Sequence, residues 1–158
     1  MRTLCPGRMS FAACAGAPPP TDAGADLKPC PGTSNCVSSR ESDPAWRVDP
    51  LPLHGSAAEG LAALRLVILA LPRSRIVAEG PGFLRAEFRS LVFRFVDDFD
   101  AVVDEPAGVI HVRSAARVGS SDLGVNRRRI GEIRDRLSAP QPQVPAANRQ
   151  RPAADGKR

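Results

Sequence analysis

The sequence predicts an α+β domain of two layers: an antiparallel sheet of about four to five strands, covered by one buried helix and a C-terminal helix. Three observations support this fold class. A capping box opens a helix near residue 56, four strand-like stretches follow within residues 75–114, and a second helical stripe begins near residue 126. Only short turns separate the successive strands, which favours antiparallel pairing.

The first helix is predicted from residue 56 to about residue 71. In "SAAE", the hydroxyl of Ser56 can accept a hydrogen bond from the amide of Glu59, whose carboxylate can bond back, and Pro72 ends the helix. Four apolar residues fall at helical spacing on one face: Leu61, Leu64, Ile68 and Leu71. Leu66, Val67 and Leu69 widen that face, so we expect a well-buried helix.

Four strands are predicted, at residues 75–79, 83–89, 91–104 and 109–114. The second alternates, with Leu84, Ala86 and Phe88 on one face. The third places six apolar residues in one register: Leu91, Phe93, Phe95, Phe99, Ala101 and Val103. After the last strand, Asn126 can cap a helix whose apolar stripe is Ile130, Ile133 and Leu137. The predicted order of elements is roughly β-α-β-β-β-β-α.

One globular domain is predicted at residues 30–138. Residues 1–29 are rich in Pro, Gly and Ala and suggest a flexible segment or a degenerate export signal, and residues 139–158 suggest a disordered basic tail. The net charge of +5 lies in the flanks: residues 1–40 carry +2, residues 41–139 carry fourteen charges of each sign, and residues 140–158 carry +3. A nucleic-acid-binding domain should carry its basic residues on the folded part, so this distribution argues against nucleic acid as a partner.

The sequence contains no apolar run near the ~20 residues that a transmembrane helix needs. The stretch "LAALRLVILAL" is too short and contains Arg65. Near the N-terminus, "FAAC" ending at Cys14 resembles a lipoprotein cleavage box, but Arg8 interrupts the apolar segment that should precede it. Membrane association is therefore expected only if Cys14 carries a lipid. A cytoplasmic location is the alternative if the chain starts as written.

Cys30 and Cys36 flank a Pro-Gly turn in "CPGTSNC" that can bring their thiols together. An exported protein would form a disulfide here, whereas a cytosolic protein would keep free thiols. We expect no metal site and no cofactor, because the cysteines and the two histidines, His54 and His111, follow no zinc-ligand pattern. The sequence has no P-loop, GxGxxG or GxSxG motif, and its serines have only two histidines as bases, so nucleophilic catalysis is poorly supported.

Asp97 falls in the inward register of its strand, between Phe95 and Phe99. An unpaired buried carboxylate costs several kcal/mol, so we expect a pair with an arginine that ties this strand to the loop at residues 113–129. Arg113 and Arg117 are the natural partners along the chain. The alternative is that Asp97, or the outward-facing Asp98, acts as a general base or metal ligand.

The loop "GSSDLGVN" combines flexible glycines with side chains that cap helices, and three arginines follow it. The start of a helix attracts anions through its free amides. One interpretation is a carboxylate or phosphate site formed by the helix start, Arg113, Arg117 and one arginine from residues 127–129. The other is that one of these arginines pairs inside the domain and the others are solvated. The candidate ligand-binding residues are Asp97, Asp98, Arg113, Ser114, Arg117, Asp122, Asn126, Arg127 and Arg129.

Three stretches, "CPGTSNCVSSR", "AEFRSLVFRFVDDFD" and "VIHVRSAARVGSSDLGVNRRRI", resemble in this order the bacterial family of domains of unknown function numbered 1499. The family patterns are approximately CPxxxNCVSS, FVDDxE and RSxSRxGxxDxGxNRxR, and the resemblance covers about residues 29–137. Asp100, Ala116 and Ser120 depart from them. Members commonly look exported or lipoprotein-like, so the resemblance implies a cell-envelope or periplasmic location and a Cys30–Cys36 disulfide. It implies no reaction.

Three hypotheses about function follow. The first is a non-catalytic cell-envelope domain whose Asp/Arg-rich loop binds an anionic small molecule or an envelope protein. The second is a hydrolase-like enzyme that uses Asp97, Asp98 or Asp122, and it requires at least one of these carboxylates to face an open cleft. The third is a purely structural Asp–Arg network, which predicts that these charges pair within the domain.

Overall fold

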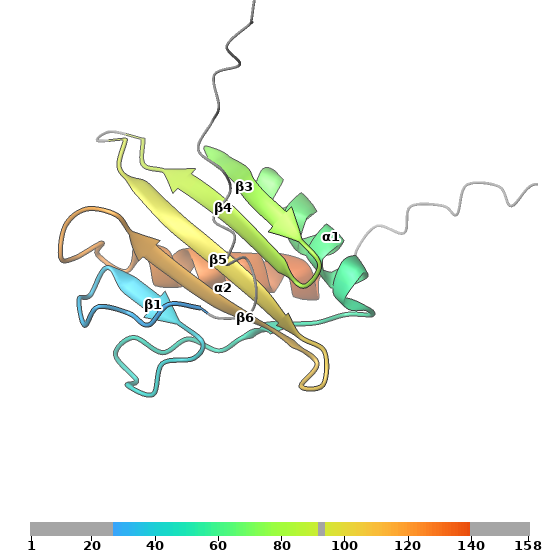
Figure 1. Ribbon diagram of the computed structural model, residues 1–158. Coiled ribbons are helices and arrows are strands. Elements are labelled where there is room, and N and C mark those ends of the chain that lie inside the picture. Colours follow the sequence, from blue (N-terminus) through green and yellow to red (C-terminus); the bar gives the residue numbers. More distant parts are fainter. Residues whose placement is uncertain (1–26, 92–93, 140–158) are drawn as a thin grey trace, which may run out of the picture.

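The computed structural model describes residues 27–91 and 94–139, which form an antiparallel sheet with two helices on one of its faces (Figure 1). In chain order the elements are β1 (Cys36–Ser38), β2 (Leu51–Pro52), α1 (Ala57–Leu69), β3 (Ser74–Gly80), β4 (Phe83–Arg89), β5 (Val96–Asp104), β6 (Val109–Ala116) and α2 (Val125–Ser138). The strands are ordered β1-β6-β5-β4-β3, and β2 also pairs with β6. The predicted α+β class is confirmed, with six strands rather than four to five.

The core lies between the sheet and the two helices. α1 contacts β3, β4 and β5, while α2 contacts β1, β2 and β6, and the helices also contact each other. Phe99 of β5 is fully buried at the centre, and its ring meets that of Phe88 edge to face with 6.1 Å between the centroids. The opposite face of the sheet carries polar and charged side chains, so the two faces have different chemistry.

Helix α1 begins as the sequence predicts. The Ser56 hydroxyl accepts a hydrogen bond from the Glu59 amide, and the Glu59 carboxylate accepts one from the Ser56 amide. Leu64, Ile68 and Leu71 are buried as expected. The expectation that Leu66 and Leu69 widen the buried face is wrong, because α1 packs on the sheet along one side only and both side chains are exposed.

Strand β5 begins at Val96, not near Leu91 as the alternation of apolar residues suggests. The chain turns first: the Ser90 amide donates to the Phe95 carbonyl, the Ser90 hydroxyl accepts from the Phe95 amide, and Arg94 has φ +54°. Leu91 and Phe95 are consequently exposed. Phe93, which was expected on the same face, lies outside the described residues.

The remaining strands after α1 are present. Before α1 the predicted order has one strand, to which no residues were assigned, and the structure has two short ones. β4 spans Phe83–Arg89 as predicted, β3 is one residue longer at each end, and β6 continues two residues further, to Ala116. β1 and β2 have three and two residues, which is too short for an alternating pattern to appear in the sequence. Both pair with β6 and extend the sheet beyond the predicted edge.

Candidate functional site

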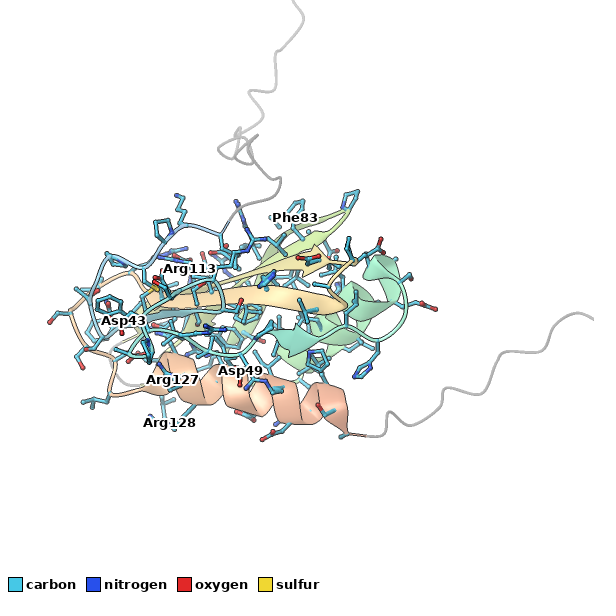
Figure 2. All side chains as sticks on the ribbon, turned by 90° about the horizontal axis from the view of Figure 1, so that it is seen from below. Asp43, Asp49, Phe83, Arg113, Arg127 and Arg128 are labelled. Carbon is cyan, nitrogen blue, oxygen red and sulfur yellow. A yellow bond between two sulfur atoms is a disulfide. The ribbon has the colours of Figure 1, made fainter. Side chains whose placement is uncertain are left out.

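The predicted site residues are divided between the two faces of the sheet. Neighbouring residues of a strand point to opposite faces, so Asp97 and Ser114 face the helices while Asp98 and Arg113 face the opposite side. Figure 2 shows Arg113 above the sheet and Arg127 of α2 below it. The candidate set therefore forms two clusters rather than one site.

A buried polar network lies between the sheet and the start of α2. Arg129 donates to Asp97 over 2.6 Å. The Arg129 side chain is only 13% exposed and that of Asp97 only 11%. The same guanidinium donates to Asn126 Oδ1 over 2.6 Å and lies 4.3 Å from the centre of the Phe88 ring. The predicted Asp97–arginine pair is therefore present. Its partner comes from α2, and neither Arg113 nor Arg117 supplies it.

Asn126 is the centre of this network and is fully buried. Its Oδ1 accepts from the Ser114 hydroxyl over 2.5 Å, and its Nδ2 donates to the Asn35 carbonyl over 3.1 Å. The predicted role of Asn126 as the helix cap is wrong, because the residue lies within the first turn of α2 and points inward. Buried polar groups need hydrogen-bond partners, and this one has partners on β6, α2 and the segment before β1.

The loop between β6 and α2 is held by side chains at both ends. Asp122 accepts from the amides of Gly124 and Asn126, at 2.9 and 2.7 Å, and so satisfies the start of the helix. Asn35 donates to the Gly119 carbonyl over 2.5 Å. Asn35 was missed as a candidate, although it belongs to the quoted "NCVSS" motif, because its partners lie more than 80 residues away.

Arg127 anchors the loop that follows β1. Its guanidinium donates to the carbonyls of Arg47 and Ala45, at 2.7 and 2.6 Å. Further along the helix, Arg134 donates to the Asp49 carbonyl. These arginines therefore satisfy backbone oxygens of residues 45–49, a segment without strand pairing beyond one bridge.

The face of the sheet away from the helices carries two rows of cross-strand charges. In the first, Arg75, Glu87 and Asp98 are register neighbours on β3, β4 and β5, and in the second, Arg85, Asp100 and Arg113 are neighbours on β4, β5 and β6. Arg117 lies over the first row and donates to Asp98 and to Glu87, at 2.7 and 2.6 Å. In the second row every neighbour has the opposite charge, which stabilises the sheet. In the first row Glu87 and Asp98 are both negative, and Arg117 offsets their repulsion by donating to both.

The carboxyl groups of these rows respond differently to their surroundings. Burial alone would raise the pKa of Glu87, but hydrogen bonds and charge from Arg117 and Arg75 outweigh it and lower the pKa below its usual value. For Asp100 burial dominates over the attraction of Arg85 and Arg113, so its pKa is raised. Hydrogen bonds to Asp98 and Glu87 raise the pKa of Arg117, which keeps this guanidinium charged.

We expect the protein to lose stability in acid partly because Glu87 becomes protonated there. A carboxyl whose pKa is lowered on folding adds stability above its unfolded pKa, about 4.3, and this contribution is lost as the pH falls through the folded value. Glu87→Gln should therefore flatten the decline of the unfolding free energy below about pH 5. Urea unfolding at several pH values measures this, with Glu132→Gln on the exposed face of α2 as the control. An unchanged acid limb in Glu87→Gln would contradict the assignment.

Ser39, His111 and Asp104 form an arrangement that the sequence did not reveal. The Ser39 hydroxyl lies 3.1 Å from His111 Nδ1, and His111 Nε2 lies 3.6 Å from an Asp104 carboxylate oxygen. This order of side chains resembles a catalytic triad. However, Ser39 is only 8% exposed and its oxygen accepts the Val112 amide over 2.9 Å. The Ser39 hydroxyl therefore extends the hydrogen bonding between β6 and the residues after β1. This role does not favour Ser39 as a nucleophile.

The cavities also lie away from the predicted residues. Two grooves of about 560 and 680 Å³ occur at the other end of the sheet, around the β3–β4 turn. Phe83 and Glu105 line both, and none of the candidate ligand-binding residues lines either. Among residues 27–91 and 94–139, no three His, Cys, Asp or Glu side chains come together as metal ligands would.

Cys30 and Cys36 form a disulfide, with their Cα atoms 5.6 Å apart. It closes the turn before β1 and so fixes the segment that carries Asn35. Cys14, the proposed lipidation residue, lies outside the described residues. Neither helix of the described chain has the length and apolar character needed to cross a membrane.

The comparison with protein families agrees with the motifs. The family described as "Protein of unknown function (DUF1499)" matches residues 26–137, which include all the strands and nearly the whole of α2. No curated protein matches the sequence significantly. The family description assigns no activity to the buried Asp97–Arg129–Asn126 network or to the charge rows. Because the match covers most of the chain, this protein belongs to the DUF1499 family.

Proposed function

We propose that this protein is a non-catalytic domain of the cell envelope that binds a partner. Its Asp/Arg motif holds the β6–α2 loop in a fixed shape, and we define the motif as Asp97, Asp98, Arg113, Arg117, Asp122, Arg127 and Arg129. The proposal rests on one observation: the carboxylates of the motif are paired with groups inside the domain. Asp97 pairs with Arg129, Asp98 pairs with Arg117, and Asp122 accepts two backbone amides. Charges that are satisfied inside a fold stabilise its shape and leave little capacity for chemistry.

The same pairing argues against the hydrolase hypothesis. A general base or metal-binding carboxylate needs an accessible oxygen beside a substrate position. Asp97 is buried under Arg129, both Asp98 oxygens accept from Arg117, and both Asp122 oxygens accept backbone amides. The two grooves around the β3–β4 turn are lined by none of these three carboxylates.

The pairing also changes which residues would meet an anionic partner. Arg113 and Arg117 contact carboxylates, and Arg127 contacts carbonyl oxygens, so an external anion would have to compete with these interactions. The hypothesis that Arg117 itself holds the anion is therefore less well supported than binding by arginines outside the motif. Folded Arg117→Ala with unchanged partner binding would agree with this assignment.

The envelope location rests on the disulfide, because such bonds persist in oxidising compartments. We expect Cys30 and Cys36 to be oxidised in the bacterial cell. Cells quenched in acid are treated with N-ethylmaleimide, and the protein is then reduced and labelled with a polyethylene glycol maleimide. Two added labels that disappear in the Cys30→Ser/Cys36→Ser variant support the location. If the first reagent blocks both thiols in cells, the proposed compartment is wrong.

A further inference from the structure

Exposed apolar side chains gather at one end of the sheet, where β4 and β6 end and β5 begins. We name this surface the loop end and define it as residues 89–91, 94–95 and 117–128. Five of the eight large apolar side chains that are exposed in the described chain belong to it: Leu91, Phe95, Val118, Leu123 and Val125. Leu123 is 85% exposed and Leu91 is 73% exposed. Figure 1 shows the two loops projecting from the same end of the sheet.

The backbone at the loop end holds these residues outward at a cost. Leu123 and Arg94 both have φ +54°, a left-handed conformation that is strained for residues other than glycine and asparagine. Asp122, on one side of Leu123, is fixed by two amide hydrogen bonds, and Arg128 donates to the Leu123 carbonyl over 2.8 Å. A leucine that is both exposed and held in a left-handed conformation does not stabilise the fold, so its position calls for an external contact.

Arginines surround the apolar side chains. Arg89, Arg94 and Arg128 are exposed, and within the described chain none of them forms an ion pair. Figure 2 shows Arg128 on the side of α2 that faces away from the sheet. Arg128 donates a hydrogen bond to the Leu123 carbonyl, but none of the three pairs with a carboxylate in the described chain, so their charges are available to an external anion.

The other end of the sheet has the opposite charge. Asp104 ends β5, Glu105 follows it, and Glu59 lies in the first turn of α1. Glu79 is the last residue but one of β3 and pairs with Arg65. Residues 41–139 have no net charge, but folding separates the charges into a basic apolar end and an acidic end. Counting charges along the sequence cannot reveal this separation, because each end is assembled from distant segments.

We propose that the loop end binds the surface of a membrane that contains anionic phospholipid. Aliphatic side chains at the tips enter the boundary between headgroups and acyl chains, and the arginines meet the phosphates. A single-stranded nucleic acid would favour stacking aromatic residues, whereas four of the five apolar residues here are leucine or valine. The inference deepens the proposed function and rests on it for the envelope location, but the contact needs no acyl chain on Cys14.

The experiment measures cosedimentation of the full chain with vesicles. It uses Cys14→Ser, so that no lipid can be attached, and compares phosphatidylcholine vesicles with vesicles that also contain phosphatidylglycerol. The apolar variant is Leu91→Ser/Val118→Ser/Leu123→Ser, and its matched control changes three exposed positions elsewhere, Leu66→Ser/Leu69→Ser/Val77→Ser. The basic variant is Arg89→Gln/Arg94→Gln/Arg128→Gln, and its matched control is Arg149→Gln/Arg151→Gln/Arg158→Gln. Circular dichroism establishes that every variant is folded.

We expect selective binding to the anionic vesicles, weakened at least about tenfold in each loop-end variant and less than about threefold in each control. Binding that depends only on the tail arginines would overturn the proposal. The proposal would also be overturned if a DNA duplex competed equally well with the vesicles and the apolar variant bound normally. That result would assign the basic end to nucleic acid. Because vesicle binding is measured on purified protein, its failure is distinct from a failure of the thiol-trapping experiment.

Discussion

Replacement of Asp97 by Asn is expected to lower the free energy of unfolding by about 3–5 kcal/mol, the cost of breaking a buried ion pair. The change keeps the size of the side chain but leaves the Arg129 charge without its counterion, although both side chains are nearly buried. Urea denaturation followed by circular dichroism measures the difference. Because the cost comes from the burial of the pair, an exposed acid of β5 should not have this effect.

Asp98→Asn on the same strand is the matched control for Asp97→Asn. Its carboxylate pairs with Arg117, but both side chains are more than one-third exposed, so solvent screens the pair and we expect a loss below about 1 kcal/mol. A loss below about 0.5 kcal/mol in Asp97→Asn would reject the structural role of the buried pair.

Asn126→Ala is expected to cost about 3–5 kcal/mol, because it leaves several buried groups without partners. The Ser114 hydroxyl, the Asn35 carbonyl and one Arg129 N–H group all lose a hydrogen bond, and Asn126 is fully buried. The thermal unfolding midpoint and urea denaturation measure the loss.

Arg128→Ala, two residues further along the same helix, is the control for Asn126→Ala. Its side chain is exposed and donates to the Leu123 carbonyl at the end of the loop, so we expect a change below about 1 kcal/mol. Similar losses in the two variants would mean that the helix position, and not the network, determines the cost.

The fold could be predicted to a large extent because its main elements have local signals. Ser56 and Glu59 predict the start of α1, and the alternation of Leu84, Ala86 and Phe88 predicts β4. The same rule failed for Leu91 and Phe95, whose alternation continues that of β5 although the chain turns there. The turn depends on Ser90 hydrogen bonds and on the φ of Arg94, which carry no distinct sequence signal.

The candidate site could be predicted only in part. The inward register of Asp97 and its need for an arginine followed from alternation and from the cost of burying a charge. Its partner, Arg129, is 32 residues away on a helix, and the choice among arginines depends on how α2 packs on the sheet. Asn35 and the Ser39–His111 contact likewise join segments more than 70 residues apart, which sequence spacing does not encode.

We infer that the Asp/Arg motif of this DUF1499 domain is an internal network that holds the β6–α2 loop in place. A double-mutant cycle with Asp97→Asn and Arg129→Gln tests it most directly. Each single variant leaves a buried charge unpaired, so we predict that the double variant loses at least about 2 kcal/mol less stability than the sum of the single losses. If the two single losses sum to the loss of the double variant within about 0.5 kcal/mol, Asp97 and Arg129 contribute independently, and the inferred network is contradicted.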